Sequence, residues 1–135
     1  FLFCCTHGYS KLTTLSFDRI ESLEYANVSY VPNRGRFNFE TIFKNVIGVS
    51  QAKVKEVSLW VSKELYPYIE SKPLHHSQSL VSEEENGNII KIFVALNYEL
   101  EQVILSYGEG LKVLSPVSLK KRVLSRIEKN LKNYQ

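Results

Sequence analysis

The amino-acid sequence predicts an α+β protein whose larger part, about residues 52–135, is a single domain. From Val54 onward, segments with the two-residue alternation of strands take turns with segments of helical periodicity. Asn, Ser, Gly and Pro residues separate these segments at the positions where caps and turns belong. The composition, 44% hydrophobic and 23% charged, is that of an ordinary globular protein. No run of eighteen apolar residues occurs, which excludes a membrane-spanning segment.

The residue pattern in the first part of the chain predicts a small antiparallel unit. Residues 1–25 have a strand-like pattern with a turn at His7–Ser10. A loop at Val31–Arg36 follows, and Asn38 can cap a short apolar helix. Gly48 ends that helix.

The second part begins with a strand at Val54–Val61, where apolar and polar residues alternate. Ser62 can cap the next helix, which Pro67 kinks or shortens. A second strand fits Gln78–Glu83. The pair Asn86-Gly87 then favours a tight hairpin.

The third strand fits Ile89–Leu96, and Asn97 can cap a helix that ends at Gly108. A fourth strand at Leu111–Leu114 leads through a cap at Ser118 into a terminal helix. Four apolar residues recur in that helix at four-residue spacing: Leu119, Val123, Ile127 and Leu131. The order strand, helix, strand, hairpin, strand, helix, strand is the split βαβ arrangement of ferredoxin-like domains.

Charge and motifs argue against several enzyme classes. The net charge is +3, and positive residues concentrate in the terminal helix, where a solvated face is the simplest interpretation. No glycine-rich phosphate loop, GxSxG, HExxH or acidic metal loop occurs. Cys4 and Cys5 are adjacent, so they cannot form an ordinary structural disulfide, and they fit a reducing cytosol. His7 and a cysteine lack a third group that would make them a nucleophile and base, so buried cysteines are expected. The sequence predicts no enzyme, cofactor or metal.

Three other features allow both a functional and an ordinary interpretation. His75 and His76 suggest a metal or acid–base site, but adjacent residues at the start of a strand point to opposite faces, which favours surface or capping roles. The run Glu83–Glu85 suggests a cation site or, more simply, a solvated hairpin end. Trp60 suggests stacking on a base or packing under a helix.

The stretch from Leu2 to Ile20 is similar to the end of the WYL domain of bacterial transcriptional regulators. In that domain a Trp-Tyr-Leu strand is followed by a turn and a strand that closes on Leu-Asp-Arg-Ile. The closing residues here are Phe17-Asp18-Arg19-Ile20, and Phe1-Leu2 stand where the motif has Tyr and Leu. Because the chain starts without Met, within a strand pattern, we expect it to be a piece of a longer protein.

The rest of the chain resembles the region that follows in the same family. Phe37–Phe43 and Gly48-Val49 resemble a short helix after the WYL barrel, and the remainder resembles the WYL C-terminal extension, WCX. The segments that carry this likeness are Val57–Trp60, Pro73–His75, Ser77-Gln78, Gly87, Ile104–Gly108, Val113–Pro116 and Leu119.

The resemblance implies a division of the chain into three parts. Residues 1–30 would be the C-terminal part of a WYL domain, a partial Sm/SH3-like β-barrel. Residues 31–51 would be a linker with a short helix, and residues 52–135 a ferredoxin-like WCX domain.

The resemblance also implies a function. The chain would be the ligand-sensing and dimerisation region of a cytoplasmic homodimer, which binds duplex DNA through an upstream helix-turn-helix domain absent here. The effector would be a single-stranded nucleic acid or a nucleotide. Arg19 stands where the family has a ligand arginine, whereas Tyr9 and Thr13 replace two others, with Lys11 nearby. Tyr9 and His7 would add stacking surface beside Arg19. The ligand residues that the resemblance implies are therefore Arg19, Lys11, Tyr9 and His7. The alternative is a protein-interaction or oligomerisation module without a ligand.

Overall fold

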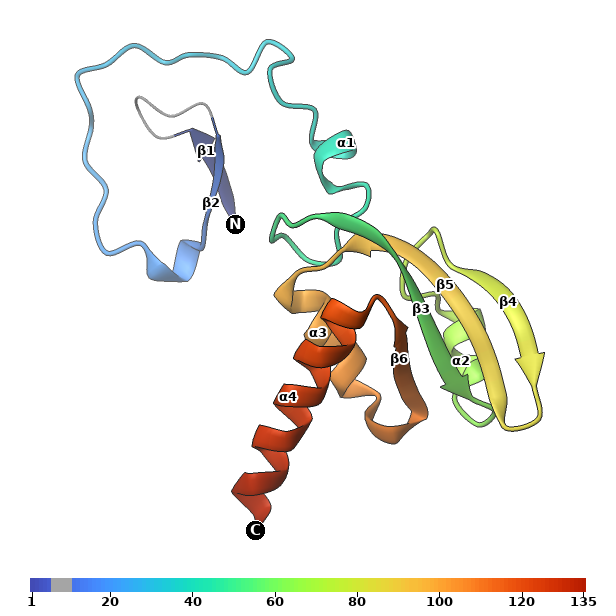
Figure 1. The fold of residues 1–135 in the computed structure, drawn as a ribbon. Coiled ribbons are helices and arrows are strands. Elements are labelled where there is room, and N and C mark those ends of the chain that lie inside the picture. The colour runs from blue at the N-terminus through green and yellow to red at the C-terminus, as the bar shows by residue number, and fades with distance from the viewer. Residues whose placement is uncertain (6–10) are drawn as a thin grey trace. The chain divides into compact units, whose positions relative to one another are not determined.

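The computed structural model describes residues 1–5 and 11–135, which divide into two units, Phe1–Phe39 and Glu40–Gln135 (Figure 1). The N-terminal unit contains β1 (Leu2–Cys5), β2 (Leu12–Leu15) and a 3₁₀-helix (Phe17–Arg19). Helix α1 (Phe39–Phe43) begins at the last residue of the N-terminal unit and continues into the second unit. The second unit then contains β3 (Val54–Ser62), α2 (Tyr66–Ser71), β4 (Ser79–Glu84), β5 (Gly87–Ala95), α3 (Tyr98–Ser106), a 3₁₀-helix (Gly108–Gly110), β6 (Leu111–Ser115) and α4 (Val117–Tyr134).

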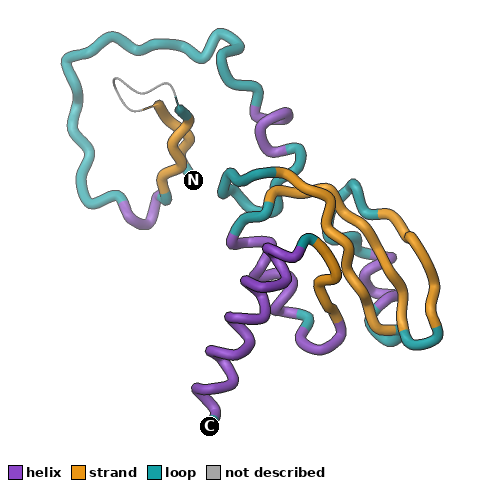
Figure 2. Tube along the Cα trace, viewed as in Figure 1, coloured by secondary structure: helices purple, strands orange, loops and turns teal. Residues whose placement is uncertain are grey.

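The N-terminal unit is built on one small sheet. Strands β1 and β2 pair antiparallel, with Leu2 opposite Leu15. After the 3₁₀-helix, residues 20–38 run as loop (Figure 2). The described residues of this unit form no closed barrel, so of the predicted partial barrel the structure supports only a two-stranded sheet. The turn predicted at His7–Ser10 lies outside the described residues.

The second unit is organised around a four-stranded antiparallel sheet in the order β4-β5-β3-β6. β4 and β6 form its edges, as Figure 1 shows. Along the chain the elements follow one another as β3, α2, β4, β5, α3 and β6, which is the predicted split βαβ order. The strand expected at Val54–Val61 continues by one residue to Ser62.

One face of this sheet carries the core. In β3 the buried residues are Val57, Leu59 and Val61, which alternate with more exposed neighbours as the sequence predicts. They form one cluster with buried residues of the other strands and of α2, α3 and α4: Ile69, Ile90, Ile92, Val94, Leu100, Ile104, Leu111, Val113, Leu119 and Val123. The three helices therefore cover the same face of the sheet.

Asn97 begins α3 as predicted and also ties down the segment before β3. Its Oδ1 accepts a hydrogen bond from the Leu100 amide at 2.8 Å, while its Nδ2 donates to the carbonyls of Ile47 and Ser50. Gly48, in the same segment, has a φ of 78° and lies against the side chain of Glu99, where a Cβ atom would clash. The segment between α1 and β3 is thus fixed by the first turn of α3.

The β4–β5 hairpin turns one residue earlier than predicted. Glu84 pairs with Gly87, so the two turn residues are Glu85 and Asn86. Gly87 is instead required for packing, because a Cβ atom there would lie 2.5 Å from the Val61 carbonyl and 2.6 Å from the Trp60 indole. The glycine therefore marks a close approach between strands rather than the turn.

The start of α2 also differs in detail. The Leu65 amide donates to Ser62 Oγ at 3.3 Å, but the residue at the helix cap is Leu65, so Ser62 is not the cap that the sequence predicts. The helix itself begins at Tyr66, with Pro67 in its first turn. Pro67 causes no kink there, because the first turn of a helix does not use its amide hydrogens.

Helix α4 starts at Val117, directly after Pro116, so Ser118 lies inside the helix and is not its cap. Leu119 and Val123 are buried, but Ile127 is 49% exposed and Leu131 is 56% exposed. The helix extends past the sheet, as Figure 1 shows, so its last turns lack the surface on which the first turns pack. Of the helices in the described chain, none is long and apolar enough to cross a membrane.

Candidate functional site

Arg19 lies at the end of the N-terminal 3₁₀-helix and lines a cavity of about 700 Å³. The cavity is formed by β1, β2 and the segment after the 3₁₀-helix. Its other lining residues are Phe1, Leu2, Thr14, Leu15, Ser16, Ile20, Glu21, Ser22 and Leu23. A guanidinium group beside hydroxyl groups and one aromatic ring is a suitable environment for a phosphate-bearing ligand, because the planar fork of Arg binds phosphate through two hydrogen bonds.

The charged groups around Arg19 leave its guanidinium available. None of the ion pairs formed by residues 1–5 and 11–135 includes Arg19, so it pairs with none of the nearby carboxylates of Asp18, Glu21 and Glu24. Asp18 accepts a hydrogen bond from Ser16 Oγ instead. That hydrogen bond, a backbone hydrogen bond and the nearby charge of Arg19 lower the pKa of Asp18.

The other predicted ligand residues are not gathered at this cavity. Lys11 is exposed, just before β2, and does not line the cavity. Thr13 is half-buried within β2. His7 and Tyr9 lie outside the described residues. Of the four predicted ligand residues, the structure therefore places Arg19 at a cavity and Lys11 away from it.

His75 has a structural role in the loop before β4. Its Nε2 donates to the Lys44 carbonyl at 2.9 Å, and its Nδ1 accepts from Ser77 Oγ at 2.7 Å. The Phe93 amide in turn donates to Ser77 Oγ at 2.8 Å. This chain of hydrogen bonds connects the end of α1, the loop and β5, and it uses both nitrogens of a neutral imidazole.

The prediction that His75 and His76 point to opposite faces is wrong. Their ring centroids are 4.0 Å apart with the ring planes tilted by 42°, because both residues lie in a loop where strand alternation does not apply. Burial lowers the pKa of His75, and the neighbouring His76 lowers it further against the opposing effect of the Lys44 carbonyl. Within the described part of the chain, no group of three or more His, Cys, Asp or Glu residues is placed to hold a metal ion.

The remaining candidates occupy ordinary positions. Cys4 is half-buried and Cys5 is exposed, so the expectation of buried cysteines is wrong for Cys5. Glu83–Glu85 are exposed at the β4–β5 hairpin. Trp60 is half-buried on the sheet face opposite the helices, and Lys112 Nζ lies 5.0 Å from the centre of its ring. Trp60 therefore does not pack under a helix as expected.

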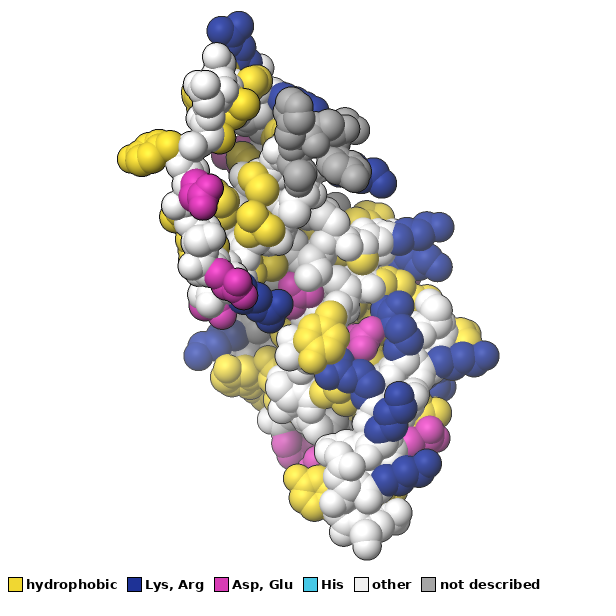
Figure 3. All heavy atoms as spheres, turned by 90° about the vertical axis from the view of Figure 1, so that its left-hand side faces the viewer, with side chains coloured by type: hydrophobic (Ala, Val, Ile, Leu, Met, Phe, Trp, Pro, Cys, Tyr) yellow, Lys and Arg dark blue, Asp and Glu magenta, His cyan; other side chains and the backbone are white. Residues whose placement is uncertain are grey.

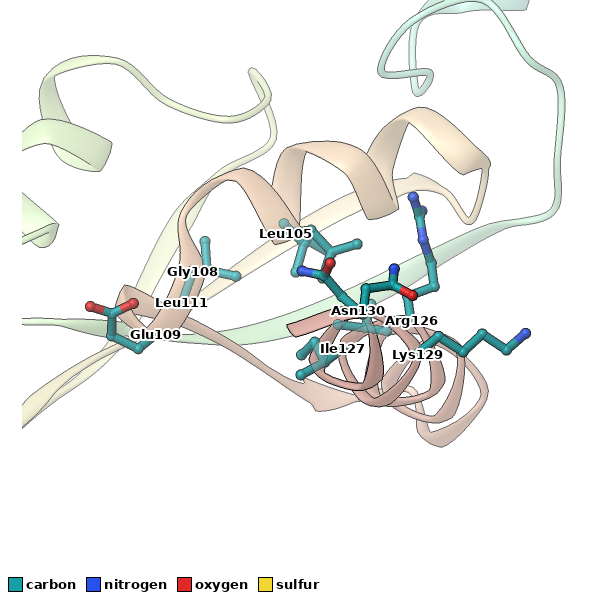
Figure 4. Close-up of a pocket in the computed structure, with 11 residues that line it drawn as sticks. Leu105, Gly108, Glu109, Leu111, Arg126, Ile127, Lys129 and Asn130 are labelled. Atoms are coloured by element: carbon teal, nitrogen blue, oxygen red, sulfur yellow. The ribbon is translucent and has the colours of Figure 1, made fainter. Parts of the chain in front are cut away.

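A groove between α3 and α4 was not predicted from the sequence. It has a volume of about 730 Å³. We call it the α3–α4 groove, and its apolar lining consists of Ile104, Leu105, Leu111, Val123 and Ile127. In Figure 4, Glu109 lies at one end and Arg126 and Lys129 lie at the other. The only sequence signal was the pattern of cations and apolar residues late in the terminal helix.

Glu101 fixes α4 beside this groove. Its side chain is only 10% exposed. Its carboxylate oxygens form ion pairs with Arg122 Nε at 2.6 Å and with Arg126 Nη1 at 3.2 Å. Arg122 also donates to the Leu96 carbonyl, and the Arg126 guanidinium lies 4.7 Å from the centre of the Tyr98 ring. These contacts hold the middle of α4 against the start of α3, so the groove wall has a defined position.

The family model of the WCX domain matches residues 53–131, which is more than half of the chain. The chain belongs to the WCX domain family. This confirms the family predicted from the resemblance, and the matched residues span the four-stranded sheet together with α2, α3 and most of α4. WCX domains belong to transcriptional regulators, so the family itself supports the prediction that this chain is not an enzyme.

Among solved structures, this WCX chain is similar to proteasome accessory factor B/C (PafBC) of Arthrobacter aurescens. The two share 21% sequence identity with a TM-score of 0.46. The similarity covers 75% of this chain and 15% of PafBC, so the chain spans only a small part of that protein. A comparison with curated proteins finds no match.

Proposed function

We propose that this WCX-containing chain is the ligand-sensing and dimerisation region of a bacterial transcriptional regulator that acts in the cytoplasm. The observation that carries the proposal is the exposed Arg19 guanidinium, which forms no ion pair with any described residue and lines a cavity of about 700 Å³. Membership of the WCX family supports the regulatory context. Duplex DNA binding would belong to a domain outside these 135 residues.

The proposed effector is a nucleotide or a short single-stranded nucleic acid. Arg19 would bind a phosphate through its two-pronged guanidinium, and the Thr14 and Ser16 side chains line the same cavity with hydroxyl groups that suit further polar contacts. The Phe1 ring, also at the cavity, would offer an apolar surface for a base. Glu21 would disfavour a ligand that presents negative charge on its side of the cavity.

Such a ligand would act as a switch only if it binds one arrangement of two chains more tightly than another. We therefore expect the regulator to be a homodimer whose arrangement depends on the effector. Binding of the ligand and association of two chains are then linked, so each should strengthen the other.

The test is a binding titration of the 135-residue chain with nucleoside mono- and triphosphates and with short single-stranded DNA and RNA. Each titration is repeated across a series of salt concentrations, because phosphate contacts release counterions and give a measurable salt dependence. Sedimentation of the same samples reports whether the ligand changes the fraction of dimer. Saturable binding with a salt dependence, together with a shift in that fraction, is the expected result.

The variant Arg19→Ala separates the cavity from general attraction to a basic protein. We expect it to lower affinity at least tenfold, because a charge-assisted bidentate contact is lost. Arg36→Ala is the matched control, since Arg36 lies in the same unit but beside Phe37 rather than at the cavity. Equal loss in both variants, or no binding by the unmodified chain, would favour the alternative of an interaction module without a ligand.

A further inference from the structure

The α3–α4 groove continues into an apolar stripe on the last turns of α4. The stripe consists of Leu124, Ile127, Leu131 and Tyr134, which recur at helical spacing and are between 49% and 85% exposed. Ile127 belongs to both features, since it also lines the groove. From Val123 to Tyr134 the surface runs for about 16 Å along the helix axis, at about 1.5 Å per residue. This length suits a peptide segment better than a small molecule.

The shape of the groove suits an apolar anchor. Leu105 and Ile127 lie on its two sides (Figure 4), and the buried residues Ile104, Leu111 and Val123 form its floor. A partner helix with apolar residues at positions i, i+4 and i+7 would insert them into such a groove. The apolar lining of the groove is aliphatic, and of the groove and the stripe only Tyr134 carries an aromatic ring. The surface therefore offers a base one stacking partner, which does not favour a nucleic acid.

The charge of α4 identifies the chemistry of the partner. The helix carries six cationic residues, Lys120, Lys121, Arg122, Arg126, Lys129 and Lys132, against the single acidic residue Glu128. Figure 3 shows Lys and Arg side chains grouped along the lower part of the molecule, where α4 ends. Glu101 neutralises part of this charge through its pairs with Arg122 and Arg126. Lys129 lines the groove and has no ion-pair partner among the described residues.

A second copy of the chain fits this surface poorly. Packing two α4 helices against each other would bring two strongly positive helices together, which is unfavourable across an interface. An acidic partner would instead gain from the same charges, while its apolar residues cover the exposed stripe.

We propose that the α3–α4 groove and the adjoining stripe of α4 form a docking surface for an acidic amphipathic helix of a partner protein. The groove receives the apolar residues of that helix, and Lys129 with the neighbouring cations contacts its acidic residues. This inference goes beyond ligand sensing and dimerisation, because it concerns a different surface in the other unit.

The test is selection of peptides from a display library against the unmodified 135-residue chain. The library holds 16-residue helical peptides with apolar residues fixed at i, i+4, i+7 and i+11 and with every other position random. We expect the selected peptides to be enriched in Asp and Glu. Their binding should weaken as salt rises, since the charges at the rim are exposed. Selected peptides without an acidic bias, or no selected peptide at all, would overturn the proposal.

Two pairs of variants locate the binding. Ile127→Glu should weaken the selected peptides at least tenfold, whereas Leu80→Glu, at a similarly exposed residue on the edge strand β4, should not. Lys129→Glu should weaken them several-fold and reduce the salt dependence, whereas Lys63→Glu, at an exposed residue that does not line the groove, should do neither. Circular dichroism confirms that each variant is folded, which is expected because the substituted side chains are half-exposed or exposed.

The other possible occupants give distinct results. A dimer that dissociates on Ile127→Glu would assign the surface to a second copy of the chain and overturn the proposal. Oligonucleotide binding that is lost in the same variant would also overturn it. Arg19→Ala should leave peptide binding unchanged, so failure of this inference and failure of ligand sensing are separately visible.

Discussion

The two units of the chain differ in what stabilises them. Every buried residue among those described lies between Val57 and Val123, within the second unit, where strands and helices share one apolar core. In the N-terminal unit no described residue is buried, and the regular structure is a two-stranded sheet with a short 3₁₀-helix. An isolated two-stranded hairpin is marginally stable in water. Stability and the proposed ligand site therefore belong to different parts of the chain.

The proposed ligand site therefore lies on a small framework that local contacts hold together. The loop after β2, for example, is organised by Asn33, whose side chain exchanges two hydrogen bonds of 2.8 Å with the Phe37 backbone. Such local contacts can rearrange when a ligand binds without loss of the core.

The largest expected effect is on the core. Ile104→Asp places a charge where the side chain is only 2% exposed, among apolar residues of the cluster. We expect the second unit to lose about 4 kcal/mol or more of unfolding free energy, a large share of the roughly 5–15 kcal/mol that stabilises a typical domain. The matched control is Leu23→Asp in the N-terminal unit, where the side chain is 84% exposed.

Thermal melting followed by far-ultraviolet circular dichroism measures both variants. A cooperative transition retained by Leu23→Asp and lost by Ile104→Asp would sharpen the contrast between the units. Equal effects of the two substitutions would show that the N-terminal unit contributes to the same cooperative core.

The second effect concerns the ion pairs that hold α4. Glu101→Ala leaves Arg122 and Arg126 without their carboxylate, at a residue that is 8% exposed. We expect a loss of roughly 2 kcal/mol, since removal of one partner from a nearly buried pair is costly. Glu56→Ala breaks the exposed pair with Lys91 and should change stability by less than about 0.5 kcal/mol.

Urea unfolding followed by tryptophan fluorescence suits this comparison, because Trp60 is the single tryptophan and lies in β3. Its signal reports the second unit. If Glu56→Ala and Glu101→Ala had the same cost, burial would not explain the contribution of these pairs.

The sequence predicted the second unit well because its signals are local. Alternation in β3 and the cap at Asn97 act within a few residues, and both are seen in the structure. The prediction placed Gly87 in the turn, which is wrong. A glycine is needed there because the Trp60 side chain, distant in sequence, leaves no room for a Cβ atom. The exposure of Ile127 was missed for a related reason. Helical periodicity shows which residues share a face, but it does not show how far the sheet extends beneath the helix.

The sites were less predictable than the fold. Arg19 was found through a motif, yet the cavity beside it depends on residues from three separate segments. His75 contacts the His76 ring and is hydrogen-bonded to Lys44 and Ser77, and no periodic pattern describes these contacts. The α3–α4 groove combines segments about twenty residues apart, so only the folded chain brings them together.

The third effect is a pH dependence of the second unit. Because burial lowers the pKa of His75 below 6.5, the unfolded chain takes up a proton more readily than the folded chain. The stability from neutral His75 is therefore complete above pH 6.5 and is lost as the pH falls through the lowered pKa. His75→Gln should cost about 1 kcal/mol at neutral pH, because it weakens the hydrogen bonds to Lys44 and Ser77.

Urea unfolding of both proteins from about pH 7.5 to about pH 5.5 covers the range in which histidine titrates. The unmodified chain should lose more stability than His75→Gln over that range. His76→Gln tests the exposed neighbour, and it should reduce the pH dependence only in part, because burial, the largest cause of the lowered His75 pKa, remains. Parallel curves for all three proteins would assign the pH dependence to other groups.

The smallest effect on stability is expected at the proposed ligand residue itself. Arg19 is exposed and takes part in none of the ion pairs formed within the described residues, so Arg19→Ala should change the unfolding free energy by less than about 0.5 kcal/mol. The same substitution should abolish the stabilisation that a bound nucleotide gives to the unmodified chain, because a ligand that binds only the folded state raises its stability. Calorimetry with and without ligand measures both quantities on one sample. A large loss of stability without ligand would mean that Arg19 supports the N-terminal unit, and the separation between a stabilising unit and a sensing unit would then fail at the residue on which it depends most.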